Sequence, residues 1–326
     1  MPSTGVEEAR GKPTGPRLKR TSEEPYGPGL GERRLRRFWQ RIGIPYMFLF
    51  PFLLLFVLFL IVPLVYALQL SLFQQRLVGG NVFVGLHNYL TAFTDSNFLG
   101  GIRRMAVFGV VQIPVMIGLA LAFALLLDGG LVWLRRTFRM AFFLPYAVPS
   151  VVAALMWGYL YGPSFGPLSE IGHNLHVAVP AFLSPSWMLV SIGNIVTWEY
   201  VGYNMIILFA ALQAVPSELR EAAAVDGASQ WAIARRIKIP LIKPALLLTV
   251  VFSIIGTLQL FNEPQIMFAI APTVIGNSYT PNLYAYNLAF TNQQYNYSAA
   301  ISFTLGAVVF IGSYTFMLVT NRRKGF

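Results

Sequence analysis

The chain lacks cysteine and carries little charge. Its 326 residues include 3 His and 13 Asp or Glu, and only 11% of them are charged. Without cysteine the chain can form neither a disulfide nor a thiolate metal site. The hydrophobic content of 56% and the positive mean hydropathy instead predict a polytopic membrane protein of the all-α class.

Motifs for catalysis, metal binding and nucleotide binding are also missing. His173 and His176 have the spacing of a metal pair, but no acidic cluster lies near them, so we expect no metal site. Gly11-Lys12 resembles part of a phosphate-binding loop, but Pro13 stands where Ser or Thr would hold magnesium. The apolar segments contain almost none of the residue sets that an intramembrane enzyme needs. We therefore expect no catalytic site and no cofactor in this chain.

Six apolar runs are present, and each is long enough to cross a bilayer core, which requires about 20 helical residues. A soluble fold would have to bury six helices of this length, so we prefer the membrane interpretation. The first run is long enough to tilt, or to kink at Pro51 or Pro63. Pro145 and Pro149 lie near the start of the third run, where a helix loses least by lacking an amide donor. The predicted spans are 46–73, 105–127, 138–161, 188–212, 244–270 and 298–320.

The net charge of +11 is distributed unevenly between the segments that connect these spans. Of 24 Lys and Arg residues, only Arg76, Arg103 and Arg104 fall on one side of the predicted membrane. This asymmetry predicts cytoplasmic N- and C-termini, so the charge indicates topology and no nucleic-acid partner is expected. Residues 1–37 are rich in Pro, Gly, Arg and Glu and predict a disordered cytoplasmic tail. The membrane domain is then 38–326.

A polar, helix-forming loop at 216–243 interrupts the series of apolar segments. Ser217 is predicted to cap a first helix, and Asp226-Gly227 predicts a turn at its end. Ser229 is predicted to cap a second helix that ends near Arg236. Pro240 and Pro244, which follow, predict a change of direction into the fifth span. The loop is therefore expected to form two short helices with a bend between them.

The spacing in this loop resembles the EAA loop through which permeases of binding-protein-dependent ABC importers contact their ATPase. It runs Glu-Ala-Ala, three residues, Gly, nine residues, and then Ile-x-Ile-Pro. VGLHNY near Gly85, FRMAFFLPYAVPS from Phe138 and YNYSAAISF from Tyr295 also resemble the sugar-type permeases, and the chain looks like the first, UgpA- or MalF-like permease of a heterodimer. The resemblance assigns the coupling role to Glu221, Ala222, Ala223, Asp226, Gly227, Ile237 and Pro240.

The resemblance also implies a fold, a location and a set of partners. The fold is the six-span, MetI-like permease fold of type I ABC importers, in a bacterial or archaeal cell membrane. The partners are a second homologous permease, two cytoplasmic ATPases that use ATP and Mg, and an extracytoplasmic binding protein that delivers a di- or oligosaccharide. A polyol phosphate such as glycerol 3-phosphate is the alternative substrate. A stand-alone channel or secondary transporter is the alternative from another class, but the inverted repeats usual there are not found.

Polar side chains inside spans are unfavourable in lipid, so they are functional candidates. Aromatic rings stack on sugar faces, and amides or carboxylates bind hydroxyls, so such residues suit a carbohydrate. The ordinary alternatives are an interfacial aromatic belt and amides that join neighbouring helices. The candidates for the substrate pathway are Trp198, Glu199, Tyr200, Tyr203 and Asn204 in the fourth span, and Gln259, Asn262 and Glu263 in the fifth.

Overall fold

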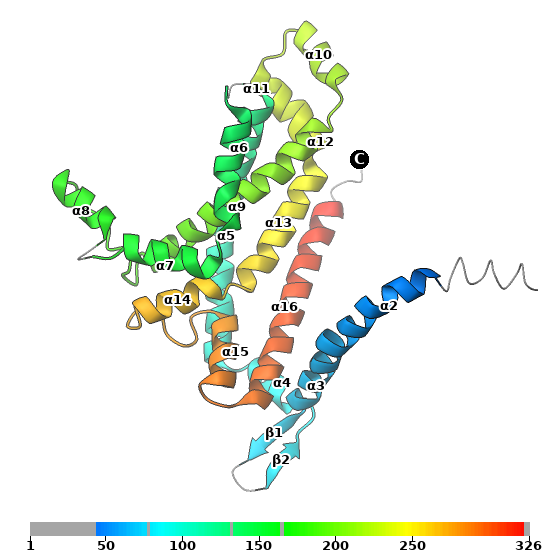
Figure 1. Ribbon diagram of the computed structural model, residues 1–326, viewed down its shortest axis with the longest axis vertical. Coiled ribbons are helices and arrows are strands. Elements are labelled where there is room, and N and C mark those ends of the chain that lie inside the picture. The colour runs from blue at the N-terminus through cyan, green and yellow to red at the C-terminus, as the bar shows by residue number, and fades with distance from the viewer. Residues whose placement is uncertain (1–43, 77–78, 131–132, 164–165, 323–326) are drawn as a thin grey trace, which may run out of the picture. The chain divides into compact units, whose positions relative to one another are not determined.

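The computed structural model describes residues 44–76, 79–130, 133–163 and 166–322 (Figure 1). The tail predicted at 1–37 lies outside these residues. Within the described part, five helices are long and apolar enough to cross a membrane, and one bent helix pair makes a sixth if it counts as a single span. The all-α, membrane-spanning prediction is confirmed. The chain divides into two compact units, and the boundary follows Pro63.

The first span is a helix over Ile44–Ser71, two residues ahead of the predicted range. It contains Pro51 without ending there. A π-helical turn separates the two α-helical halves of this span. Single turns of this kind occur inside α-helices that otherwise continue. The three parts are α2 (Ile44–Phe56), η2 (Val57–Ile61) and α3 (Val62–Ser71).

A short β-hairpin follows α3 in the second unit. Strand β1 (Phe73–Arg76) pairs antiparallel with β2 (Gly80–Phe83), with Phe73 opposite Phe83. The two rings meet edge to face with 5.3 Å between their centroids. The sequence did not predict this hairpin because four-residue strands are too short for a period of two to be recognised. Helix α4 (His87–Ala92) comes next.

The centre of the second unit is the packing of α5 (Ser96–Asp128) against α9 (Met188–Gln213). Helix α5 begins at Ser96, earlier than the predicted span, because the Asp95 carboxylate accepts hydrogen bonds from the amides of Asn97 and Phe98. The contact is lined by buried apolar side chains spaced three to four residues apart on each helix. They are Ile113, Met116, Ile117, Ala120, Ala124 and Leu127 of α5, and Val201, Met205, Leu208 and Leu212 of α9.

The third span is not the single helix predicted at 138–161. It consists of two helical segments, Arg135–Ala147 and Ser150–Leu160, that meet at 97°. Helix α6 starts ahead of the predicted span, so Pro145 and Pro149 fall in the middle of the segment rather than near its start. Val148 takes an extended conformation because it precedes a proline. The segment comprises α6 (Arg135–Phe143), the 3-10 turn η3 (Leu144–Ala147) and α7 (Ser150–Leu160).

The fifth span is interrupted between Leu258 and Asn262, which the sequence prediction of one run over 244–270 did not include. Pro264 cannot donate to the carbonyl group four residues earlier, which favours a restart of the helix at this point. Helix α13 lies beside α16 (Figure 1). The remaining elements are α8 (Pro167–Asn174), α13 (Lys243–Leu258), α14 (Asn262–Ile270), α15 (Pro281–Phe290) and α16 (Tyr295–Arg322).

Candidate functional site: a cavity and a coupling loop

The loop between α9 and α13 forms two helical segments, as the sequence predicts. Their elements are α10 (Ser217–Val225), α11 (Gln230–Ile233), the π-helical η4 (Ala234–Lys238) and α12 (Ile239–Leu241). The prediction that Ser217 caps α10 is wrong. Pro216 is the cap residue, with a ψ of 134°, and no side chain caps the helix. Because proline already fixes φ near the helical value, the chain turns into the helix at Pro216.

The predicted turn after α10 is confirmed at Gly227. Its φ is +79°, a left-handed conformation that L residues disfavour and glycine, which has no Cβ, adopts readily. The amide of Ala228 donates to the Ala223 carbonyl at 2.9 Å, and the amide of Gly227 donates to the Ala224 carbonyl at 3.1 Å. These two bonds form a Schellman motif, which satisfies carbonyls that the helix end would leave unpaired. The glycine therefore sets where α10 stops.

The second segment begins as predicted and ends later than predicted. The Ser229 hydroxyl accepts a hydrogen bond from the Ala232 amide at 3.2 Å, which confirms it as a cap. The segment continues to Leu241 rather than ending near Arg236. Pro240 does not stop it and lies directly after the π-helical turn η4, at one of the first two positions of α12.

The loop exposes apolar side chains beside charged side chains of both signs. The exposed fraction is 88% for Val225, 67% for Trp231 and 45% for Leu219. Large apolar side chains left in water on a polar loop indicate a partner surface. Of the predicted coupling residues, Ala223 and Ile237 are half-buried, and the exposed ones are Glu221, Ala222, Asp226, Gly227 and Pro240.

A cavity of about 340 Å³ lies between α9 and the interruption of the fifth span. Its volume falls in the range of about 300–1,000 Å³ that is usual for small-molecule sites. Irregular backbone within a membrane span is tolerated where it lines a cavity. Six of the eight predicted pathway residues line it: Tyr200, Tyr203, Asn204, Gln259, Asn262 and Glu263.

The other two candidates lie outside the cavity lining. Trp198 meets Trp157 edge to face, with 5.9 Å between ring centroids. Glu199 and Glu263 are each 3% exposed, and they lie close enough for their charges to interact. The Glu199 Oε1 atom has no hydrogen-bond partner among the described residues. Glu199 is therefore a buried neighbour of a lining residue and not itself part of the lining.

The third span supplies residues at this site that the sequence analysis missed. Tyr146 stacks on Tyr203 with 4.7 Å between centroids and meets Tyr200 at 5.8 Å. The Ser150 hydroxyl accepts a hydrogen bond from the Asn262 side-chain amide at 2.7 Å. Both residues flank the 97° bend, so reading Pro145 and Pro149 as a mid-span break would have pointed to them.

A second, larger cavity of about 720 Å³ lies beside the hairpin, α4 and the start of α16, at the end of the second unit away from the coupling loop (Figure 1). Its lining is rich in amides from the hairpin and from the segment before α16, and it was not predicted. It includes Gln74, Gln75, Asn292, Gln293 and Gln294. Within the described residues, no three His, Asp or Glu side chains are grouped to hold a metal ion.

Residues 115–323 match the family described as the inner membrane component of binding-protein-dependent transport systems. This match covers more than half of the chain. The chain belongs to this family. The resemblance that was drawn from the loop and the flanking motifs is thereby confirmed.

The permease is 31% identical to the lactose transport system permease LacF of Rhizobium radiobacter, over 89% of this chain and 97% of that protein. It is 29% identical to the arabinooligosaccharide permease AraP of Bacillus subtilis, over 88% of this chain and 92% of that protein. Family membership argues against a stand-alone channel or secondary transporter.

The fold of the permease is shared with a solved structure of a bacterial alginate ABC transporter in complex with a periplasmic protein that holds an alginate pentasaccharide. The TM-score is 0.77 at 20% identity, and the match covers 90% of this chain and 99% of the other. At this identity the likeness establishes the fold. It therefore confirms the MetI-like permease fold that the sequence predicts.

Proposed function

We propose that this permease is one of two permease subunits of an ATP-driven importer for a di- or oligosaccharide. An extracytoplasmic binding protein delivers the sugar, and two cytoplasmic ATPases that bind ATP and Mg power the transport. The second permease is a homologue of this chain. The complex lies in a bacterial or archaeal cell membrane, with both termini of the chain in the cytoplasm. The sugar permeases among the relatives support this proposal.

The observation that carries the substrate class is the chemistry of the 340 Å³ cavity. Tyr200 and Tyr203 line it beside the side-chain amides of Asn204 and Asn262. Tyr146 is not part of the lining and stacks on Tyr203. A sugar ring presents apolar C–H faces and a rim of hydroxyl groups. Stacking on the aromatic rings and hydrogen bonds to the amides therefore match both of its surfaces.

A polyol phosphate fits the cavity less well. None of the lining residues is Lys or Arg, and one of them is Glu263. A phosphate in a poorly hydrated site needs a cationic partner, because an unpaired buried charge is strongly unfavourable. A neutral sugar has no such requirement, so we favour it over glycerol 3-phosphate.

The loop at 216–243 supports the coupling part of the proposal. Its exposed apolar side chains and the Glu221 carboxylate form the kind of helix face that docks into a groove of a partner. When the ATPases close on ATP, they push on this loop and on its counterpart in the second permease. The pathway then opens outward, and hydrolysis resets it inward, as in rigid-body alternating access.

The first test is purification of the permease from its native membrane in a gentle detergent, with its partners identified by mass spectrometry. Wild-type chain is compared with Glu221→Ala and Gly227→Asp. The matched control is Glu170→Ala, which removes an exposed carboxylate from α8, at the other end of α9. We expect an ATPase and a second permease with the wild type and the control. The two loop variants should lose the ATPase.

Uptake by vesicles completes the test. The importer should accumulate a labelled disaccharide only with ATP and the binding protein, and should leave glycerol 3-phosphate outside. A chain that purifies alone and moves sugar without ATP contradicts the proposal. Uptake of glycerol 3-phosphate in place of the sugar would instead correct the substrate class.

A further inference from the structure

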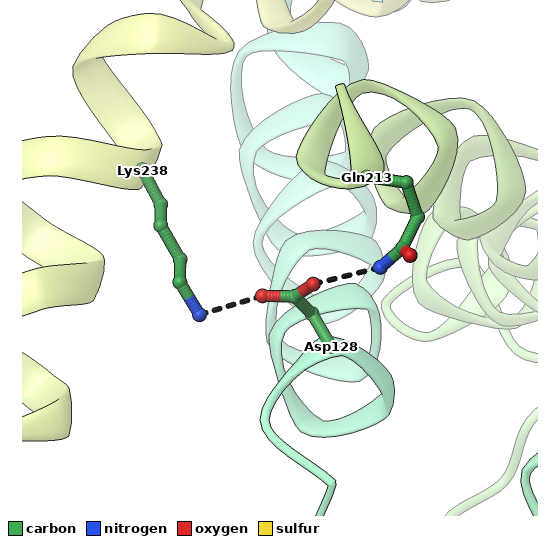
Figure 2. A network of polar contacts seen from close by, with 3 residues as sticks. All are labelled: Asp128, Gln213 and Lys238. Carbon is green, nitrogen blue, oxygen red and sulfur yellow. Dashed lines mark hydrogen bonds and ion pairs between the residues drawn. The ribbon is translucent and has the colours of Figure 1, made fainter. Parts of the chain in front are cut away.

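A buried ion pair joins the coupling loop to the transmembrane helices. Figure 2 shows Lys238 of η4 and Gln213 of α9 reaching the carboxylate of Asp128 from two sides. Lys238 Nζ lies 2.6 Å from Asp128 Oδ2, and Gln213 Nε2 lies 2.8 Å from Oδ1. The side chains of Lys238 and Asp128 are only 7% and 1% exposed. One carboxylate thus connects three elements.

The position of this carboxylate is unfavourable by itself. Asp128 is the last residue of α5, where the helix dipole places partial negative charge. Burial adds the loss of hydration, and a buried ion pair gains little over apolar residues of the same size. Neither local helix stability nor net burial energy therefore explains the pair. What it does supply is directional contact between fixed groups on three segments.

The network sits at one end of a continuous packed path to the cavity. Met116 of α5 lines the cavity and belongs to the same buried cluster as Leu127. It lies 12 residues before Asp128, which corresponds to about 18 Å of helix. On the other side, Gln213 ends the helix that carries Tyr200, Tyr203 and Asn204. Any displacement of Lys238 thus acts on the ends of two of the helices that line the cavity, α5 and α9.

We propose that the Lys238–Asp128–Gln213 network is the connection through which movement of the coupling loop reaches the sugar cavity. This inference rests on the proposed import function. Lys238 is a positioning residue that acts through Asp128. It holds η4 to α5 and α9, so that the loop and the two helices move as one body when the ATPases close. Loss of the pair uncouples ATP hydrolysis from transport.

The test uses the complete importer in proteoliposomes with its binding protein and a labelled disaccharide. Sugar transported per ATP hydrolysed is measured for wild type, Lys238→Met, Asp128→Asn and the double variant. Residues that link two sites change their coupling by roughly 2- to 30-fold, so we expect each single variant to lower the ratio by that factor. Arg139→Met is the matched control, because it removes an exposed cation from α6. It should keep the wild-type ratio.

The double variant keeps the test decisive if a single variant folds poorly. It removes both charges and leaves no buried charge unpaired. If the pair acts as one connection, the double variant is no worse than either single variant. Lys238→Arg keeps a cation and should retain most of the ratio.

Three results would overturn the inference. The first is a wild-type ratio in the double variant, and the second is an equal fall of transport and hydrolysis, which indicates loss of assembled complex only. The third is a double variant that assembles no complex at all, which makes the pair a requirement for assembly. If wild-type transport needs no ATP, the proposed function itself has failed, and that outcome is separate from these three.

Discussion

Gly227 fixes the end of α10 through its backbone conformation and not through a lack of space. A Cβ atom at this position would meet no atom within 4 Å, but the φ of +79° is unfavourable for alanine by about 1–2 kcal/mol. Gly227→Ala should therefore fray α10, with amide hydrogen exchange of its last turn roughly 5- to 30-fold faster. Exchange measured by mass spectrometry tests this.

Gly276→Ala is the control for this substitution, since its Cβ also meets open space and its φ is not positive. In Gly276→Ala, amide hydrogen exchange of the last turn of α10 should match the wild type. Unchanged exchange in α10 of Gly227→Ala would mean that the left-handed turn contributes nothing to the helix end.

Single residues show what the sequence could and could not predict. The turn at Gly227 and the cap at Ser229 were predictable because both depend on neighbours in the chain. The Lys238–Asp128 pair was not predictable, because its members are 110 residues apart. In the sequence, each of them looks like any charged residue near the end of a span. Local conformation follows from local sequence, whereas long-range polar contacts require the packing to be known.

At the scale of elements, α6 and α9 cross without space for a side chain at Gly202. A Cβ atom there would overlap the carbonyl oxygen of Phe142, which belongs to the backbone and cannot rotate away. We predict that Gly202→Ala forces the two helices apart and lowers stability by about 1–3 kcal/mol. Thermal unfolding of the purified permease measures the effect, and Gly118→Ala is the control.

Gly118 lies on the exposed side of α5, and a Cβ atom there would meet no atom within 4 Å. Alanine has the higher helix propensity, so this variant should unfold at or slightly above the wild-type temperature. If Gly202→Ala unfolds with the wild type, the close crossing of α6 and α9 is not a packing constraint.

The third and fifth spans show why element shapes were harder to predict than element positions. Hydrophobicity located both segments, but it reports only the burial of side chains in lipid. The 97° bend depends on where Pro145 and Pro149 fall relative to the helix start at Arg135, and no side-chain cap marks that start in the sequence. The two irregular spans also supply Asn262, which lines the cavity, and Tyr146, which stacks on the lining residue Tyr203.

For the whole molecule, the cavity is lined by residues in the middle of α9, whereas the coupling loop follows its C-terminal end. Substitutions at the two places should therefore affect sugar binding and complex assembly separately. Asn262 is exposed in the cavity and bonds only Ser150 among the described residues. Asn262→Ala should therefore leave the assembled importer intact and reduce sugar uptake by about 2- to 10-fold, the value of one neutral hydrogen bond.

Glu199→Ala should impair uptake by a different route, because Glu199 is buried outside the cavity lining and lies beside the lining residue Glu263. Uptake at varied sugar concentration separates the two variants. Asn262→Ala should raise the half-saturating concentration, since it removes a group that faces the sugar. Glu199→Ala removes the buried carboxyl group beside Glu263, so it changes the surroundings of a lining residue and should lower the maximal rate as well. Asn277→Ala, outside the cavity lining, is the control, and full uptake by both test variants would remove this cavity from the sugar pathway.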